Sequence, residues 1–73
     1  MYLKRRSLME HFDTSESTVD RTIRFIKKGI DERRYPATSI IWMGATHRSP
    51  RVDEEIFRKA LGDIQWERMR WTR

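Results

Sequence analysis

This chain of 73 residues is long enough for one domain but too short to enclose a deep catalytic pocket, because a domain of this size buries only about 60% of the surface that its unfolded chain exposes. Its 16 Lys and Arg residues outnumber 11 Asp and Glu, and the net charge of +5 favours a polyanionic partner such as nucleic acid. The small size favours a binding module over an enzyme. The absence of cysteine excludes a disulfide framework and a thiolate metal site, which fits a reducing cytoplasm.

The N-terminal part of the chain predicts two short helices. Residues 1–4 are expected to form an extended lead-in, followed by a first helix over about residues 5–12. A second helix is expected over about residues 16–28. It should end at Gly29, because glycine adopts the left-handed conformation of a helix end at the lowest cost.

Apolar side chains recur at helical spacing on one face of each predicted helix, as two helices that pack together require. These residues are Leu8, Met9 and Phe12 in the first helix and Val19, Ile23, Ile26 and Ile30 in the second. Between the helices, Asp13 tolerates the bent backbone of a sharp turn, and Ser15 is placed to cap the second helix. Residues 8–23 therefore predict a helix-turn-helix, an arrangement typical of DNA-binding proteins.

The opposite face of the second helix is polar and mostly basic. Arg21 and Arg24 are suited to guanine edges or phosphates, and Ser17 and Thr18 can reach bases or backbone oxygens. The expected DNA contacts of this helix are Ser15, Ser17, Thr18, Arg21, Arg24 and Lys28. The alternative is that these side chains form the solvated face of an ordinary amphipathic helix.

Two acids accompany this basic face. Glu16 can accept a hydrogen bond from a cytosine amino group, but we favour its role as an ordinary acid at the positive end of the helix. Asp20 is expected to be solvated or paired with a basic side chain.

A β-hairpin is expected after the helix pair. Residues 30–38 have the composition of a polar connector, and residues 39–43 favour a strand. Residues 44–50 are typical of a turn, and residues 51–52 favour a second short strand. The predicted hairpin therefore has a basic tip.

The tip of this hairpin suits the minor groove, where concentrated negative potential attracts arginine. Its expected contacts are Thr46, His47, Arg48 and Ser49, with Arg48 the strongest candidate. His47 favours a phosphate contact over a metal ligand, because His11 is the one other histidine and no cysteine accompanies them. No metal site is expected. Trp42 is either a core anchor, which we favour, or a ring packed under the tip.

A third helix is expected to begin after Asp53, a good N-cap followed by two acids. Its apolar face should close the core and consists of Ile56, Phe57, Ala60, Leu61 and Ile64. Gly62 either costs the helix about 1 kcal/mol relative to alanine or marks the start of its end. The DNA-binding domain is accordingly assigned to residues 1–64.

Residues 65–73 form a basic and aromatic C-terminal tail, and the sequence leaves open whether this tail is ordered. Its aromatic rings either fold back on the core or present a surface to a partner such as an integrase or a second copy. The candidate partner-binding residues are Trp66, Met69 and Trp71.

The distribution of charge and of apolar residues along the chain indicates where the protein acts. Residues 21–51 hold eight Lys and Arg and two acids, a net charge of +6. The longest apolar run is Ile40–Met43, too short to span a membrane, and no signal-peptide pattern precedes Ser7. We therefore expect a cytoplasmic protein that binds no membrane.

The predicted order of helix, turn, helix, hairpin and helix is that of a winged helix-turn-helix, an α+β and mostly helical fold with a two-stranded wing. Over about residues 2–64 the chain resembles the small excisionases of phages and conjugative elements, whose fold is related to the DNA-binding domain of the MerR regulators. The residues that carry this resemblance are Leu8 to Phe12, Thr14-Ser15-x-Ser17-Thr18-Val19-x-Arg21-x-Ile23, Arg34-Tyr35-Pro36 and Arg51-Val52-Asp53. The chain departs from the pattern at Asp13, where glycine is frequent, and at Met9, where a small alanine is favoured.

The resemblance implies an accessory DNA-binding protein that takes part in DNA recombination without catalysing it. The second helix would enter the major groove and the hairpin the adjacent minor groove. Several copies on neighbouring sites would bend the DNA, so that an integrase assembles the excision complex. Double-stranded DNA, an integrase and further copies are then the partners, with no cofactor and no small-molecule substrate.

Two other interpretations stay open at this point. The first is a small phage-type regulator of transcription that takes no part in recombination. The second is a protein-interaction adaptor that uses the same fold. An enzyme is not expected, because the sequence shows no nucleophile with a base, no carboxylate pair placed in a cleft and no phosphate-binding glycine loop.

Overall fold

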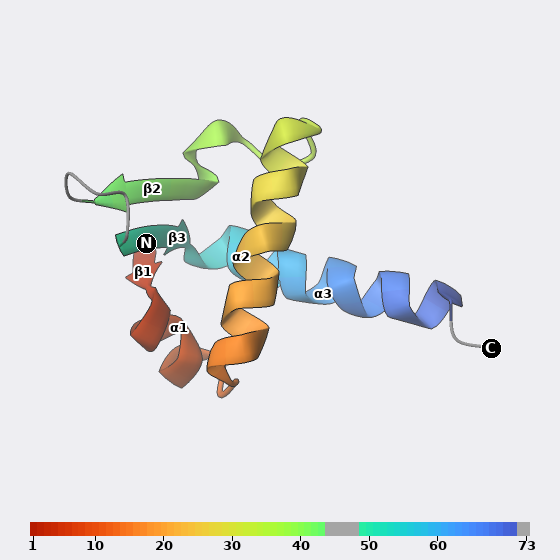
Figure 1. The fold of residues 1–73 in the computed structure, drawn as a ribbon, viewed down its shortest axis with the longest axis horizontal. Coiled ribbons are helices and arrows are strands. Elements are labelled where there is room, and N and C mark those ends of the chain that lie inside the picture. The colour runs from red at the N-terminus through yellow and green to blue at the C-terminus, as the bar shows by residue number, and fades with distance from the viewer. Residues whose placement is uncertain (44–48, 72–73) are drawn as a thin grey trace.

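The computed structural model describes residues 1–43 and 49–71, except for the side chains of residues 43, 49 and 68–71. In that part the chain is α+β and mostly helical, with three α-helices, one 3-10 helix and a three-stranded antiparallel sheet. The elements are β1 (Tyr2–Lys4), α1 (Arg5–His11), α2 (Glu16–Asp31), η1 (Ala37–Ser39), β2 (Ile40–Met43), β3 (Ser49–Asp53) and α3 (Glu54–Trp71). Figure 1 shows the sheet on one side of α2, with α3 starting at the sheet, passing α2 and extending beyond it.

The turn between α1 and α2 confirms the prediction made from its residues. Asp13 has a φ of 49°, the left-handed conformation that a short polar residue tolerates in a sharp turn. The hydroxyl of Ser15 caps α2 by accepting a hydrogen bond from the backbone nitrogen of Thr18 at 3.3 Å. The apolar faces of the two helices meet as expected, with Leu8 and Val19 fully buried.

The end of α2 contradicts the prediction. The helix continues through Gly29 to Asp31, so the connector expected at residues 30–38 is shorter and contains η1. Arg33, with a φ of 61°, is the left-handed residue that follows the helix. Gly29 is buried inside the helix against the ring of Tyr35, where the Cβ of any other residue would overlap the ring. A close approach, rather than a helix end, accounts for this glycine.

The sheet contains the predicted hairpin and one strand more. β2 and β3 pair antiparallel, with Ile40 opposite Val52. The hairpin belongs to a three-stranded sheet, because the N-terminal lead-in pairs as β1 with the other edge of β3 and places Leu3 opposite Val52. This pairing satisfies backbone groups of β3 on both sides and sets apolar residues side by side on the face toward the helices.

One core joins the sheet to the three helices. Its buried apolar residues are Leu8, Val19, Ile23, Ile26, Tyr35, Ile40, Val52, Phe57 and Ala60. Thr22 is also fully buried, and its hydroxyl donates a hydrogen bond to the carbonyl oxygen of Thr18 at 2.7 Å. The core thus packs one face of α2 against α1, α3 and the sheet, which leaves its polar face pointing outward.

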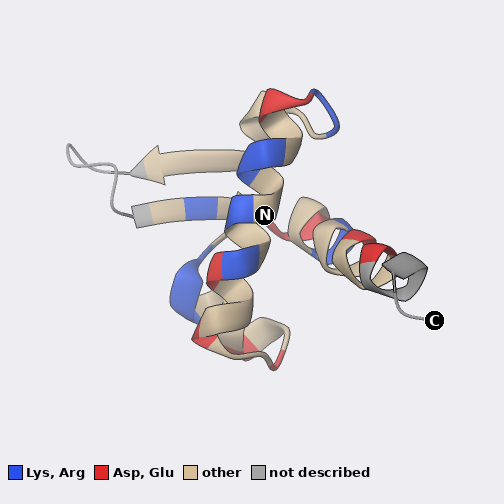
Figure 2. Ribbon diagram, turned by 45° about the vertical axis from the view of Figure 1, so that its right-hand side comes forward, with Lys and Arg blue, Asp and Glu red and all other residues tan. Residues whose placement is uncertain are grey.

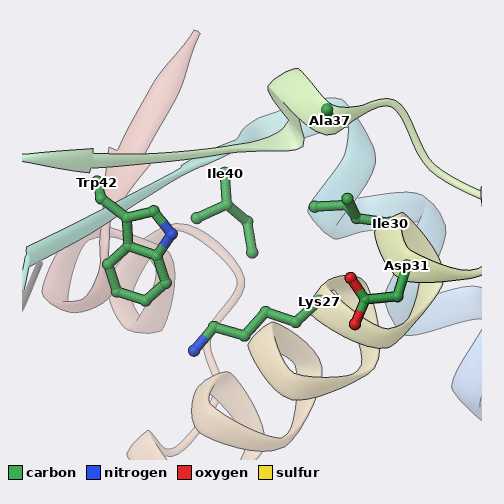
Figure 3. A pocket seen from close by; sticks show the side chains of 6 residues that line it. All are labelled: Lys27, Ile30, Asp31, Ala37, Ile40 and Trp42. Atoms are coloured by element: carbon green, nitrogen blue, oxygen red, sulfur yellow. The ribbon is translucent and has the colours of Figure 1, made fainter.

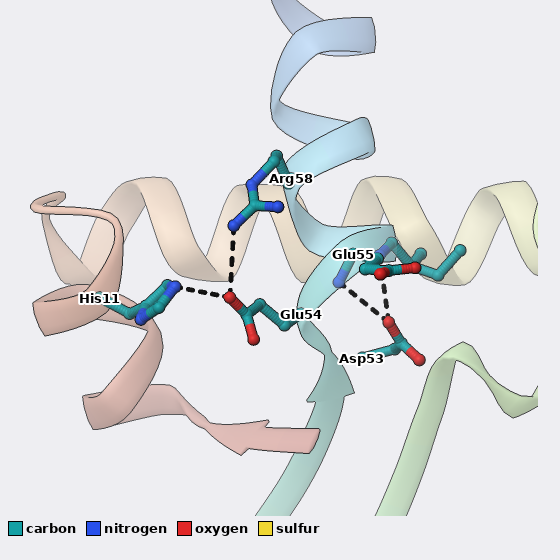
Figure 4. A network of polar contacts seen from close by, with 6 residues as sticks. His11, Asp53, Glu54, Glu55 and Arg58 are labelled. Atoms are coloured by element: carbon teal, nitrogen blue, oxygen red, sulfur yellow. Dashed lines mark hydrogen bonds and ion pairs between the residues drawn. The ribbon is translucent and has the colours of Figure 1, made fainter. Parts of the chain in front are cut away.

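The start of α3 is held by two sets of polar contacts (Figure 4). As predicted, Asp53 caps the helix, because its Oδ1 accepts hydrogen bonds from the backbone nitrogens of Glu55 at 2.9 Å and Ile56 at 3.3 Å. The Oε1 atom of Glu54 lies 2.7 Å from Nε2 of His11 and 3.3 Å from Nη2 of Arg58. Glu54 therefore ties the first turn of α3 to the end of α1.

The later part of α3 is a continuous helix. Gly62 lies within it and does not mark its end, since the helix continues to Trp71. Residues 65–71, which the sequence left open, thus continue the helix, and its C-terminal end projects past α2 (Figure 1).

Candidate nucleic-acid interface

The face of α2 that points away from the core is exposed and basic. Figure 2 shows the Lys and Arg positions along this helix in blue. The exposed side chains of this face are Ser17, Arg21, Arg24 and Lys28, all predicted DNA contacts. On the opposite side of the helix, Val19, Ile23 and Ile26 are at most 4% exposed. Three of the four exposed residues, Ser17, Arg21 and Arg24, line a hollow of about 310 Å³ together with Asp20.

The basic side chains of this face are not neutralised by neighbouring acids. Asp20 pairs with Arg5 of α1, whose Nε lies 3.0 Å from Oδ1 of Asp20. Of the two outcomes expected for this acid, solvation or an ion pair, the structure shows the ion pair. Among the described residues, no ion pair joins Arg21, Arg24 or Lys28 to a carboxylate. Elsewhere on the surface, basic residues do contact carboxylates, namely Arg5, Arg6, Arg34, Arg58 and Lys59. The face of α2 therefore keeps a positive charge that an external anion can bind.

Two of the predicted contacts lie at the margin of this face. The Oγ atom of Ser15 caps the helix and lies 3.1 Å from Oγ1 of Thr18. Thr18 is half-buried and faces α3, where it lines a small hollow of about 110 Å³ with Leu61 and Ile64. The structure thus brings Ser17, Arg21, Arg24 and Lys28 together and sets Thr18 toward the other helix.

The hairpin that was expected to enter the minor groove is described only in part. Its strands β2 and β3 pair from Ile40 to Met43 and from Ser49 to Val52. Thr46, His47 and Arg48 lie outside the described residues, and so does the side chain of Ser49. Their contacts with DNA stay predictions.

Trp42 is not the core anchor that we favoured from the sequence. Its side chain is 36% exposed and lies opposite Pro50 on the face of the sheet that turns toward α2. Nζ of Lys27 lies over this ring, 4.5 Å from its centroid (Figure 3). Among the described side chains of β2, Ile40 is buried and Ile41 and Trp42 are exposed, and a long side chain of α2, that of Lys27, lies over the indole.

Lys27 is the residue of this region that the sequence analysis did not select. Its position three residues after Arg24 places it about 60° around the helix, on the flank of the basic face nearest to β2. Helical spacing puts Lys27 on this flank with Glu16 and Asp20, but the approach of Trp42 depends on the path of the chain between Lys27 and Trp42.

The C-terminal half of α3 carries the predicted partner-binding residues. Trp66 is 62% exposed, so this ring does not fold back on the core. The side chains of Met69 and Trp71 are outside the described residues. Oε1 of Glu67, one residue after Trp66, lies 3.7 Å from Nη1 of Arg34, which links this part of the helix to the loop after α2.

Within residues 1–43 and 49–71, no three His, Asp or Glu side chains gather closely enough to hold a metal ion. The helices of the same residues lack the combination of length and apolar character needed to cross a bilayer.

Comparison of the chain with protein-family models, with curated proteins and with solved structures finds no match, so its function is argued from its own residues.

Proposed function

We propose that this protein binds double-stranded DNA as a winged helix-turn-helix, with α2 in the major groove and the hairpin of β2 and β3 at the adjacent minor groove. The observation that carries the proposal is the exposed basic face of α2, which forms no ion pair with the described residues and behind which the core fixes the helix. In this arrangement Arg21 and Arg24 are placed to contact guanine edges or phosphates.

The biological role that fits this activity best is that of an excisionase. It would bind and bend attachment-site DNA in the cytoplasm and leave the chemistry to an integrase. This part of the proposal rests on the resemblance of residues 2–64 to excisionases. The exposed Trp66 adds an apolar surface on α3 on which an integrase or another copy of the chain could dock.

Duplex binding is tested by measuring affinity for DNA flanking the gene, and for random DNA, over a range of salt concentrations. Because several phosphates would be neutralised, the logarithm of the association constant should fall linearly with the logarithm of the salt concentration. A response independent of salt, or equal affinity for all sequences, would reject sequence-specific recognition.

The role of α2 is tested by Arg21→Ala and Arg24→Ala, with Arg58→Ala on α3 as the matched control. We expect at least one α2 variant to lose about 1–3 kcal/mol of binding free energy and the control to bind like the wild type. If both α2 variants fold and retain full affinity, base recognition by this face is excluded.

A regulator of transcription would pass the same binding tests, so a genetic measurement separates the two roles. Deletion of the gene should abolish excision of the element that carries it. Unchanged excision together with altered transcription from a neighbouring promoter would assign the protein to regulation instead.

A further inference from the structure

A second basic position lies beside the face already described, in a hollow of about 410 Å³ between α2 and β2. Lys27 and Asp31 line it from α2, and Ile40 and Trp42 line it from β2 (Figure 3). In the part of the chain that the structure describes, Lys27 forms no ion pair, although Asp31 follows it by one helical turn. Its ammonium lies on the indole of Trp42 instead.

We infer that Lys27, positioned by Trp42, binds a backbone phosphate of the DNA strand that passes between α2 and the hairpin. This inference rests on the proposed function and adds a site to it. The contact between Lys27 and the phosphate would position the protein on DNA, in contrast to the base contacts assigned to Arg21 and Arg24.

The location of Lys27 supports a phosphate rather than a base. The major and minor grooves of a duplex are separated by a sugar-phosphate strand. With α2 in one groove and the hairpin tip in the next, the surface between these elements faces that strand. Lys27 and Trp42 occupy this surface, because the first lies on the flank of α2 nearest to β2 and the second on the strand that leads to the tip.

The chemistry of the pair also fits an anion. A lysine ammonium on the face of an indole keeps its full charge and can still donate hydrogen bonds to a phosphate. The ring restricts a long side chain that would otherwise lose conformational freedom on binding. Asp31 disfavours an anion at its own end of the hollow, which confines the phosphate to the end that Trp42 lines.

The test compares Lys27→Ala with Lys59→Ala. Lys59 is a matched control because its Nζ also lies over an aromatic ring, 5.2 Å from the centroid of Tyr35, but on α3. Loss of one phosphate contact should make the slope of log affinity against log salt shallower by about 0.9. Between about 50 and 200 mM salt, the affinity of Lys27→Ala should therefore fall about 3.5-fold less than that of the wild type. The change should be equal for specific and random duplexes, and Lys59→Ala should keep the wild-type slope.

The positioning role of Trp42 is tested in the same assay. Trp42→Ala should weaken binding in the same direction as Lys27→Ala, and Trp42→Phe should restore most of the affinity because an aromatic face is kept under the ammonium. Full affinity in Trp42→Ala would remove Trp42 from the site, and an equal loss of affinity in Trp42→Ala and Trp42→Phe would reject positioning by an aromatic face. Circular dichroism checks the fold of each variant, and Lys27→Gln repeats the charge removal with a longer polar side chain.

The outcomes separate this inference from the proposed function. If the wild type binds duplex DNA with a steep salt dependence and Lys27→Ala and Lys27→Gln retain its full slope, the phosphate site is rejected and the proposed function stands. If Lys27→Ala weakens binding to one sequence alone at an unchanged slope, Lys27 contacts a base and the assignment is wrong. If the wild type shows no salt-dependent binding, the proposed function fails and this site fails with it.

Discussion

The ring of Tyr35 lies directly against the backbone of Gly29, inside the last turns of α2. The contact holds the loop that follows α2 against the helix, and the phenol of Tyr35 extends from there to α3, where its hydroxyl donates a hydrogen bond to Oδ2 of Asp63 at 2.5 Å. One aromatic side chain therefore connects α2 to α3.

Gly29→Ala should destabilise the protein, although alanine is the better helix former by about 1 kcal/mol. The added Cβ would overlap ring carbons of Tyr35, and overpacking of this kind typically costs about 1–3 kcal/mol. Urea denaturation measures the change. Gly62→Ala is the control, because a Cβ there meets nothing within 4 Å, and this variant should be more stable than the wild type. Equal behaviour of the two variants would contradict the close approach.

The stability of the protein should depend on Tyr35 in alkaline solution. Burial raises the pKa of the Tyr35 phenol, and the hydrogen bond to Asp63 raises that pKa further. Because the folded state holds the proton more tightly than the unfolded state, this contribution is complete below about pH 10, the ordinary tyrosine value, and is lost as the pH rises above it.

Denaturation curves collected up to and above about pH 10 should therefore show a steeper loss of unfolding free energy for the wild type than for Tyr35→Phe. Tyrosinate absorbance of Tyr2→Phe, in which Tyr35 is the one remaining tyrosine of the two in the chain, gives the titration directly. Titration of this variant at the ordinary tyrosine pKa would contradict the effect of burial.

Asp53→Ala should cost about 1 kcal/mol of unfolding free energy, because two backbone nitrogens at the start of α3 lose their acceptor. Asp53→Asn should be closer to the wild type, since asparagine keeps an acceptor oxygen at the N-cap. Thermal or urea denaturation provides the comparison. If alanine and asparagine at this position prove equally stable, the cap does not contribute as the geometry indicates.

Two aromatic truncations in α3 should differ sharply in their effect on stability. Phe57 is fully buried, and its ring centroid lies 4.9 Å from that of Phe12, so Phe57→Ala should cost about 3–5 kcal/mol. Trp66 is 62% exposed, and Trp66→Ala should change the stability by no more than about 0.5 kcal/mol. A large loss of stability in Trp66→Ala would show that this side chain serves the fold instead of being available to a partner.

The parts of the structure that could be predicted from the sequence depend on neighbouring residues. The spacing of apolar residues located α1, α2 and α3, and the caps at Ser15 and Asp53 located two helix starts. Asp13 at the turn and the exposed face of Ser17, Arg21, Arg24 and Lys28 followed from the same local patterns. Such features could be predicted because a hydrogen bond within one turn, or the period of a helix, involves residues a few positions apart.

Tertiary structure decided the features that depend on residues distant in the chain. Glycine suits both a helix end and a close contact, and only the packing of the Tyr35 ring against Gly29 shows that the close contact applies there. In the same way, the pairing of Leu3 with Val52 made the lead-in a strand, and the path of β2 past α2 placed Trp42 under Lys27 rather than in the core. The sequence by itself thus determined which helix presents a basic face. Tertiary packing determined which residues support that helix and which lie beside its basic face, because these contacts form only when elements distant in the chain come together.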